Sequence, residues 1–344
     1  METQKKKLKP WAKLLIVVAC VIAFLGVILL GAIGYFRLSV SDYYKNSEKA
    51  FVIPGLSDGY VPQGFCYDEN SNWFLATGYM TDNSASPIYV IDKESGKTVK
   101  SVRLKKKDGS AYTGHAGGIA VWGNYVYVAV GGEHCVYVFD YSDLKADGAK
   151  NIESIGVFKT ETDDGAYIKP AFVEVNGNNI VIGEFYRDPQ YKTHTSHKIT
   201  THNGNKNTAL AVEFELDTSF DFGINPTPKK AYSMIEQVQG LTFDESGRIY
   251  LSTSWGLSFS HIFVYDETLA SCENKFVLKH NTPVYHLDGA SLIKDIKLAP
   301  MSEEMVILGK KLYVMCESAS NKYIFGKFTG GKWCYATDLT KYGL

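Results

Sequence analysis

Short apolar runs alternate with short polar turns along most of this chain. Residues 62–79 (PQGFCYDENSNWFLATGY) and 238–256 (VQGLTFDESGRIYLSTSWG) share one plan: Gln-Gly opens an apolar run, an acidic turn follows, and a second apolar run ends in small residues and an aromatic. Residues 117–132, 171–186 and 303–318 repeat that plan. Runs of about four to eight residues rich in Val, Ile, Tyr and Phe, bounded by Gly, Asn and Asp, predict β-strands. A strand–turn–strand unit therefore recurs through the chain.

Each recurrence belongs to a larger repeat with four predicted strands. The repeats cover about 62–110, 114–160, 167–235, 237–280 and 301–340. Such self-similarity is typical of propellers and arrays, and four antiparallel strands repeated around a ring are the blades of a propeller. We therefore expect an all-β fold, a β-propeller with five four-stranded blades, rather than a solenoid or a sandwich. A sixth blade would require residues 51–56 and 281–300 to form a degenerate unit. The interpretation we favour adds 51–56 to the last blade, where it helps to close the ring.

The second halves of the last two repeats are less regular. In the fourth repeat, the pattern predicts the fourth strand at 275–279 and a short helix at 289–298. In the fifth repeat, it predicts the third strand at 323–328. These assignments decide which strands stand at the outer edges of the two blades.

An uncharged apolar run of 23 residues, 14–36, precedes the repeats. At about 1.5 Å per residue, a helix of this length spans the ~30 Å hydrocarbon core of a bilayer. Five lysines precede the run, which places the N-terminus in the cytoplasm by the positive-inside rule. We predict a cytoplasmic basic tail (1–13), a transmembrane signal-anchor helix (14–36), a stalk (37–50) and an extracytoplasmic propeller domain (51–344). A signal peptide cleaved after residues 32–34 is the alternative.

Charge and cysteine content narrow the range of partners. Five of the 36 basic residues and one of the 37 acidic residues precede residue 14, which leaves 31 basic and 36 acidic residues in the rest. Without a basic stripe, we do not expect a nucleic acid as partner. The six cysteines form no CxxC pair. We expect most of them to be buried free thiols, and Cys316 and Cys334 are the pair that could form a disulfide.

The blade motifs carry a family resemblance. Residues 238–266 resemble the blades of gluconolactonase, strictosidine synthase and NHL-type propellers, and residues 88–104 (IYVIDKESGKTVKSVRL) resemble YVTN-type repeats. The resemblance covers most of residues 60–340 as a blade pattern; it implies a propeller and says little about activity. In hydrolase-like members of these families, calcium is held at the channel mouth by Glu, Asn and Asp side chains. The corresponding blade starts carry Gln, Gly, Pro, Gln and Glu here.

A propeller groups its loops on two faces. One of these faces carries the residues that are suited to ligand binding or catalysis. On that face the first strands start and the second strands end, so their side chains should converge near the channel axis. The starts carry Gln63, Gly117, Pro170, Gln239 and Glu303, with His115 and Gln237 one pleat earlier, and the ends carry Tyr79, Glu133, Glu184, Trp255 and Glu317. The other face has ordinary polar turns such as 68–72 and 244–248.

Three roles are predicted for these side chains. Because aromatic faces stack on sugars and planar ligands, we expect the ligand-binding residues to be Gln63, Tyr79, His115, Glu184, Tyr186, Gln239, Trp255 and Glu317. The candidates for general acid or base are His115 and Glu184. The candidate metal ligands are Glu184, Glu303 and Glu317, with calcium as the cation. For the two glutamines and His115, hydrogen bonding to backbone and water is an equally good interpretation.

The insertion 187–207 (RDPQYKTHTSHKITTHNGNKN) lies between the second and third strands of the third repeat, and hence over the same mouth. It contains His194, His197 and His202, but HxxH and HxxxxH spacings are weak as zinc-ligand geometry. A solvated lid is the interpretation that we favour. No P-loop or HExxH motif is present.

The sequence thus predicts a single-pass membrane protein whose propeller binds an envelope glycan, peptide or protein at the face with His115, Glu184 and Glu317. A permanent anchor and the lack of a complete catalytic set favour this function. The alternatives are a calcium-dependent hydrolase or lyase that acts at the channel mouth, and a structural subunit of a membrane complex.

Overall fold

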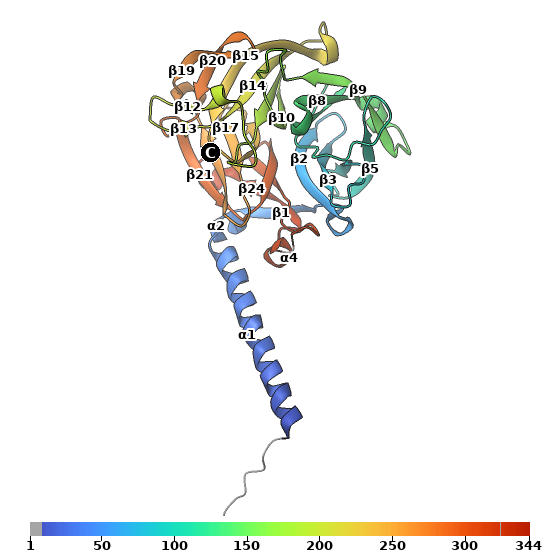
Figure 1. Cartoon of the computed structure of the whole chain (residues 1–344), viewed down its shortest axis with the longest axis vertical. Helices are drawn as coiled ribbons and strands as arrows, with labels where there is room; N and C mark the ends of the chain where they lie inside the picture. The colour runs from blue at the N-terminus through green and yellow to red at the C-terminus, as the bar shows by residue number, and fades with distance from the viewer. Residues whose placement is uncertain (1–8, 324) are drawn as a thin grey trace, which may run out of the picture. The chain divides into compact units, whose positions relative to one another are not determined.

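The computed structural model describes residues 9–323 and 325–344, and the chain divides into two compact units, 1–41 and 42–344. The first unit contains helix α1 (Pro10–Leu38), which starts with a proline at a position where the missing N–H needs no partner (Figure 1). None of its described side chains is buried. Among the described residues, α1 is the one helix that is long and apolar enough to cross a membrane. Helix α1 contains the whole of the predicted membrane-spanning segment, residues 14–36.

The second unit consists mainly of antiparallel strands, which form hydrogen-bonded sheets of eight, six, four, four and two strands (Figure 1). Antiparallel runs of four strands recur within these sheets, and each such run is called a sheet below. The first sheet has the order β2 (Tyr60–Asp68), β3 (Trp73–Met80), β4 (Pro87–Asp92), β5 (Thr98–Lys105). The second has the order β6 (Ile119–Trp122), β7 (Tyr125–Val130), β8 (Cys135–Asp140), β9 (Asn151–Lys159). The third begins with β10 (Pro170–Asn176), β11 (Asn179–Glu184), β14 (Ala209–Leu216), β15 (Ile224–Met234).

The remaining sheets complete the unit. The fourth has the order β16 (Val238–Phe243), β17 (Ile249–Thr253), β18 (Ser260–Tyr265), β21 (Leu292–Leu298), and the last has the order β22 (Ser302–Leu308), β23 (Lys311–Cys316), β24 (Trp333–Asp338), β1 (Ser47–Val52). Outer strands also pair in parallel: β5 pairs with β9, and β15 pairs with β20 of the hairpin β19 (Cys272–Val277) and β20 (His280–His286). Shorter elements are α2 (Ser41–Lys45), α3 (Tyr141–Lys145), α4 (Phe325–Thr329), β12 (Ile199–Thr200) and β13 (Lys206–Asn207).

The first strands of these sheets contact one another in the cyclic order β2, β6, β10, β16, β22 and back to β2. They surround the axis of a nearly closed ring, which confirms the expected all-β, propeller-like fold. The repeated Gln-Gly serves this packing. A Cβ at Gly64 would lie 2.1 Å from the carbonyl oxygen of Gly117, and a Cβ at Gly240 would lie 2.8 Å from the Cα of Glu304. Only glycine permits the first strands to approach the axis so closely.

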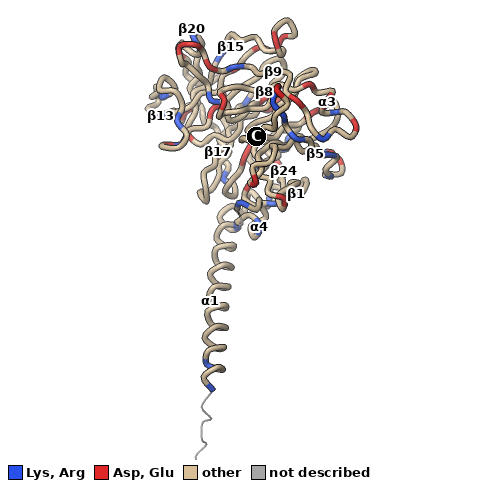
Figure 2. The backbone as a smooth tube through the Cα atoms, turned by 45° about the vertical axis from the view of Figure 1, so that its right-hand side comes forward, with Lys and Arg blue, Asp and Glu red and all other residues tan. Residues whose placement is uncertain are grey.

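Apolar side chains between neighbouring sheets form the core. Leu75 and Val90 of the first sheet pack with Val126 and Val128 of the second, and all four are fully buried. Because successive side chains of a strand alternate between its faces, each sheet presents one set to each neighbour. Figure 2 shows basic and acidic residues interspersed over the unit. All six cysteines are free, so Cys316 and Cys334, the pair considered for a disulfide, are not bonded to each other.

Strand β1 supplies the outer strand of the last sheet by pairing antiparallel with β24. Phe51 is buried, with its ring centroid 5.4 Å from that of Phe74 in the first sheet. A closing strand is therefore present, but it covers 47–52 instead of 51–56, because the chain turns at Pro54 and at Gly55, which has a φ of +68°. Residues 47–50 thus belong to the propeller unit and not to a stalk.

Three assignments in the irregular repeats are wrong. Segment 289–298 forms β21 instead of a helix: Ile296 and Leu298 are buried at a period of two, and pairing with β18 overrides the helix-like spacing of its apolar residues. Segment 275–279 lies at the β19–β20 hairpin and does not pair with β18. The described part of 323–328 enters α4 and not a strand, and β1 takes the fourth place in that sheet.

Candidate functional site

A cavity of about 1070 Å³ opens where the first strands start and the second strands end. Residues from all of the sheets line it, including pairs as far apart in sequence as Gln63 and Glu317. The predicted residues that line the cavity are Gln63, Tyr79, His115, Glu133, Gln239, Trp255, Glu303 and Glu317. Glu184 and Tyr186 are not among its lining residues. The ring therefore brings most of the predicted set together and leaves these two outside.

Tyr79, His115 and Lys322 form one side of the cavity, which we call the polar wall. The His115 ring lies flat on Tyr79, with ring centroids 3.9 Å apart and planes 15° apart. Lys322 donates a hydrogen bond to the Tyr79 phenol oxygen. Desolvation by surrounding protein atoms and the nearby Lys322 charge lower the pKa of His115, although its ring is open to the cavity. The imidazole is therefore neutral at pH 7 and can accept a proton or a hydrogen bond from a ligand.

The buried Glu303 and the half-buried Glu317 lie beside the polar wall. Gln63 Nε2 donates to Glu317 Oε2 at 3.2 Å, whereas Glu303 Oε1 has no hydrogen-bond partner among the described residues. Burial raises the pKa of Glu317 to about 7, even though Lys322 and Gln63 act to lower it. Burial and the neighbouring Glu317 raise the pKa of Glu303 well above its ordinary value. The pair therefore holds at least one proton at neutral pH, as two carboxyls in a shared site do.

Glu304 is also buried. Its Oε2 accepts hydrogen bonds from the backbone N–H groups of Phe65, at 2.6 Å, and Ile119, at 3.3 Å. These residues belong to the first strands of two other sheets. Burial and the nearby Glu174 raise the pKa of Glu304 well above its ordinary value. Glu304 thus joins sheets at the axis and does not line the cavity.

Phe185, Tyr191 and Trp255 form an aromatic cluster in the cavity lining. The Phe185 and Tyr191 rings meet edge to face with centroids 5.4 Å apart, and the Trp255 centroid is 6.1 Å from each. The guanidinium of Arg187 lies 5.5 Å from the Trp255 ring centre. Because Tyr191 is 43% exposed and the other two rings are half-buried, the cluster presents flat apolar surface to the cavity.

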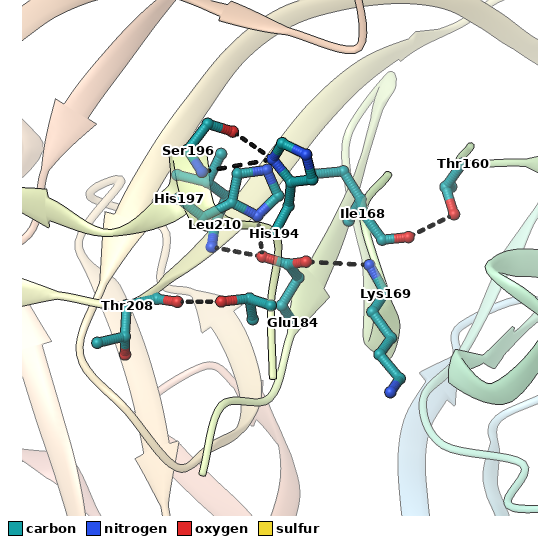
Figure 3. Close-up of polar contacts among 10 residues, drawn as sticks. Thr160, Ile168, Lys169, Glu184, His194, Ser196, His197, Thr208 and Leu210 are labelled. Carbon is teal, nitrogen blue, oxygen red and sulfur yellow. Dashed lines mark hydrogen bonds and ion pairs between the residues drawn. The ribbon is translucent and has the colours of Figure 1, made fainter. Parts of the chain in front are cut away.

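Glu184 is fully buried and its carboxylate is occupied by protein groups (Figure 3). Its Oε1 accepts from the Lys169 N–H, and its Oε2 accepts from the Leu210 N–H, both at 3.1 Å. Oε2 also lies 2.7 Å from Nδ1 of His197, which is 5% exposed. The carboxylate therefore ties the start of β10, the start of β14 and the insertion 187–207 together. Tyr186 is buried in the core of the third and fourth sheets.

The His197–Glu184 contact predicts how the insertion is held. A His197→Ala substitution removes one partner of a buried carboxylate, at a cost of about 1–3 kcal/mol, and should release residues 187–207. We expect faster trypsin cleavage at Lys192 and Lys198, measured by mass spectrometry of the digest. His194→Ala is the control, because His194 is only half-buried and bonds Ser196 within the insertion. Equal cleavage rates in the two variants would show that the buried contact does not hold the insertion.

The other histidines of the insertion point to different neighbours. His194 meets the edge of Tyr167, and His202 lies 3.3 Å from Ser271 Oγ. In the part of the chain that the structure describes, no group of three or more His, Cys, Asp or Glu side chains is placed to hold a metal ion. The insertion thus offers no zinc-ligand group. Since Glu184 has its own partners, calcium at the mouth stays a prediction that concerns Glu303 and Glu317.

Sequence reasoning missed several lining residues: Lys169, Phe185, Tyr191, Lys322 and Tyr323. Phe185 immediately follows a predicted strand end, and Lys169 immediately precedes a predicted strand start, so a wider window at each position would have included both. Tyr191 lies in the insertion, where only histidines attract attention. Lys322 and Tyr323 fall at a segment that the pattern assigns to a strand, which hides their place in a loop at the mouth.

Comparisons with known proteins assign no family to the chain. No family model and no curated protein matches the chain. Among solved structures, it is similar to glutaminyl cyclase from Myxococcus xanthus (9% identity, TM-score 0.44, 85% of this chain and 94% of that chain). It is also similar to PQQ-bound aldose sugar dehydrogenase from Streptomyces coelicolor (12%, 0.44, 84% and 95%) and to a nidogen/laminin complex (13%, 0.38, 75% and 73%). These neighbours are β-propeller-like proteins, and no specific family is assigned to the chain.

Proposed function

We propose that this protein is a membrane-anchored β-propeller that binds an envelope glycan in the cavity of its ring. In this proposal the sheets are five blades closed by β1. Helix α1 spans the cytoplasmic membrane and the propeller lies outside the cytoplasm, an orientation supported by the five lysines before the apolar run.

The observation that carries the proposal is an aromatic cluster and a polar wall in the same cavity. A sugar ring has an apolar C–H face and a rim of hydroxyl groups. Aromatic side chains stack on such a face, and a few placed polar groups bind the rim and fix orientation. The aromatic cluster supplies the stacking surface, and the polar wall with Gln63 and Gln239 supplies the polar groups for the hydroxyl rim.

The size of the cavity favours an oligosaccharide. Sites for small molecules are about 300–1,000 Å³, and this cavity is about 1070 Å³. It therefore has room for several sugar rings, and binding should strengthen with chain length until the cavity is filled.

Replacing Trp255 by alanine tests the site. Truncation of a stacked aromatic at the centre of an interface costs about 2 kcal/mol or more, so we expect binding to weaken ~30-fold. The probes are chitotetraose and hyaluronan tetrasaccharide, titrated calorimetrically into the full-length protein in detergent. Trp255→Phe keeps a ring and should retain most of the affinity. If Trp255→Ala binds a probe as well as the wild type does, the glycan proposal is wrong.

An enzyme that uses acid–base chemistry is the second candidate, and one observation favours it. Glu317, with a pKa raised to about 7 mainly by burial, and His115, neutral at pH 7, line the same cavity. A protonated carboxyl and a neutral imidazole are a general acid and a general base. Mass spectrometry of the probes after titration separates the two candidates: intact probes support binding alone, and cleaved probes support an enzyme.

A further inference from the structure

We propose that the glycan is anionic: the cavity selects sugars that carry a carboxylate or a phosphate, and Lys169 and Lys322 bind that group. This inference rests on the proposed glycan site and names the chemical class of its ligand.

The basic residues of the cavity lining differ in their partners. Lys106 is paired with Glu133, with Nζ 2.7 Å from Oε1. Among the described residues, neither Lys169 nor Lys322 has a carboxylate oxygen within the 4.0 Å of an ion pair. Lys322 contacts neutral groups instead, with its ammonium bonded to the Tyr79 phenol and 5.1 Å from the Tyr323 ring centre. Two cationic groups are therefore available to a ligand in the cavity.

The acidic residues of the lining do not offset these two cations. Glu133 is occupied by Lys106 and also accepts a hydrogen bond from Tyr137. Burial and the neighbouring Glu317 raise the pKa of Glu303 well above its ordinary value, which favours the uncharged form of this carboxyl. Glu317 stays partly protonated at neutral pH because burial raises its pKa to about 7. The cavity therefore carries a net positive charge at pH 7 and below, where it attracts anions most strongly.

The two lysines flank the aromatic cluster around the ring. Lys169 immediately precedes β10 of the third sheet, and Lys322 follows β23 of the last sheet. Phe185 and Trp255 follow the second strands of the third and fourth sheets, which lie between those positions in the cyclic order. A sugar stacked on the cluster would thus have an ammonium group on either side. Figure 3 shows that the Lys169 side chain extends away from the Glu184 carboxylate that binds its backbone N–H.

Contacts within the protein hold each lysine in place. The Lys169 backbone is held by Glu184, which His197 fixes in turn. Lys322 is held by its hydrogen bond to Tyr79, which stacks on His115. Preorganised cations lose less conformational entropy when they bind an anion than free surface lysines do.

The experiment compares three probes by calorimetry with the full-length protein in detergent at pH 6.5: chitotetraose, which is neutral, hyaluronan tetrasaccharide, which carries carboxylates, and pentamannosyl 6-phosphate, which carries a phosphate. We expect at least one anionic probe to bind about tenfold or more tightly than the neutral one, and added salt to reduce the difference. The probe with the larger preference identifies the anionic group. Lys322→Met and Lys169→Met should each weaken binding of the anionic probe more than binding of chitotetraose, and so remove most of that preference.

Two variants are the controls. Lys322→Arg keeps the charge and should keep the preference, and the double variant Lys106→Met/Glu133→Gln removes a neutralised pair from the same cavity and should also keep it. Equal binding of neutral and anionic probes, or a preference that survives both methionine substitutions, would overturn the anionic assignment while the glycan site stands. Failure of all three probes would overturn the glycan site itself.

Discussion

Replacing Glu304 by leucine is expected to lower the free energy of unfolding by about 4 kcal/mol, whereas glutamine is expected to change it by less than about 1 kcal/mol. Glu304 accepts hydrogen bonds from the backbone N–H groups of Phe65 and Ile119 at the ring axis. Leucine leaves both buried donors without an acceptor, at about 1–3 kcal/mol each. Glutamine keeps an acceptor oxygen of the same reach. Urea denaturation in detergent, followed by near-ultraviolet circular dichroism, measures both variants. Equal losses would show that these hydrogen bonds do not hold the sheets together.

Comparison of the glutamine variant with the wild type also measures how much the Glu304 carboxyl contributes to the pH dependence of stability. Burial raises the pKa of Glu304 in the folded state, so between the ordinary carboxyl pKa and the folded-state pKa the native protein binds a proton that the unfolded chain releases. Stability from this group is complete below the ordinary pKa and falls as pH rises. Between pH 5 and 9, Glu304→Gln should therefore lose less stability than the wild type. Parallel profiles would mean that Glu304 is ionised in the native protein.

A chain that starts at residue 53 is expected not to fold, whereas a chain that starts at residue 42 is expected to fold as a monomeric domain. The shorter chain lacks β1, which leaves β24 with an open backbone edge and removes Phe51 from the core. Loss of that ring alone costs about 3–5 kcal/mol, and the open edge favours aggregation. The longer chain keeps β1 and the buried Tyr43, which meets Tyr335 of β24. Gel filtration and circular dichroism distinguish the outcomes.

A peptide of residues 42–52 is the control for this truncation. If β1 acts by completing the last sheet, the peptide should restore folding of the 53–344 chain when it is added during refolding. A 53–344 chain that folds alone would show that the ring does not need its first strand.

The regular part of the fold follows from local pattern, and the irregular part does not. Strands in the first three repeats are bounded by turns within the chain, so alternation and Gly, Asn or Asp locate them. Segments 275–279 and 289–298 can both be outer strands, and the choice depends on which one pairs with β18. That pairing is a tertiary contact that no local window contains. Residues 47–52 likewise become a strand because β24 offers them a partner at the far end of the chain.

The candidate site was predictable in position but not in every role. The ring geometry placed Tyr79, His115, Trp255 and Glu317 at one cavity, as the aligned strand ends indicate. Glu184 occupies an aligned position as well, yet its side chain bonds the backbone of neighbouring strands and His197. Alignment gives the place of a residue along a strand. Whether its carboxylate faces ligand or protein depends on donors supplied by other segments, which the sequence does not reveal.

The pairing of β1 with β24 also determines when the last sheet can be completed during synthesis of the chain. The ribosome makes β1 soon after helix α1 and makes β24 only after the strands of all the other sheets. Joining strands so distant in the chain carries a large loop-closure entropy, so it should be the slowest step of assembly. Until β24 has been made, each nascent chain holds an incomplete domain in which β1 has no partner strand.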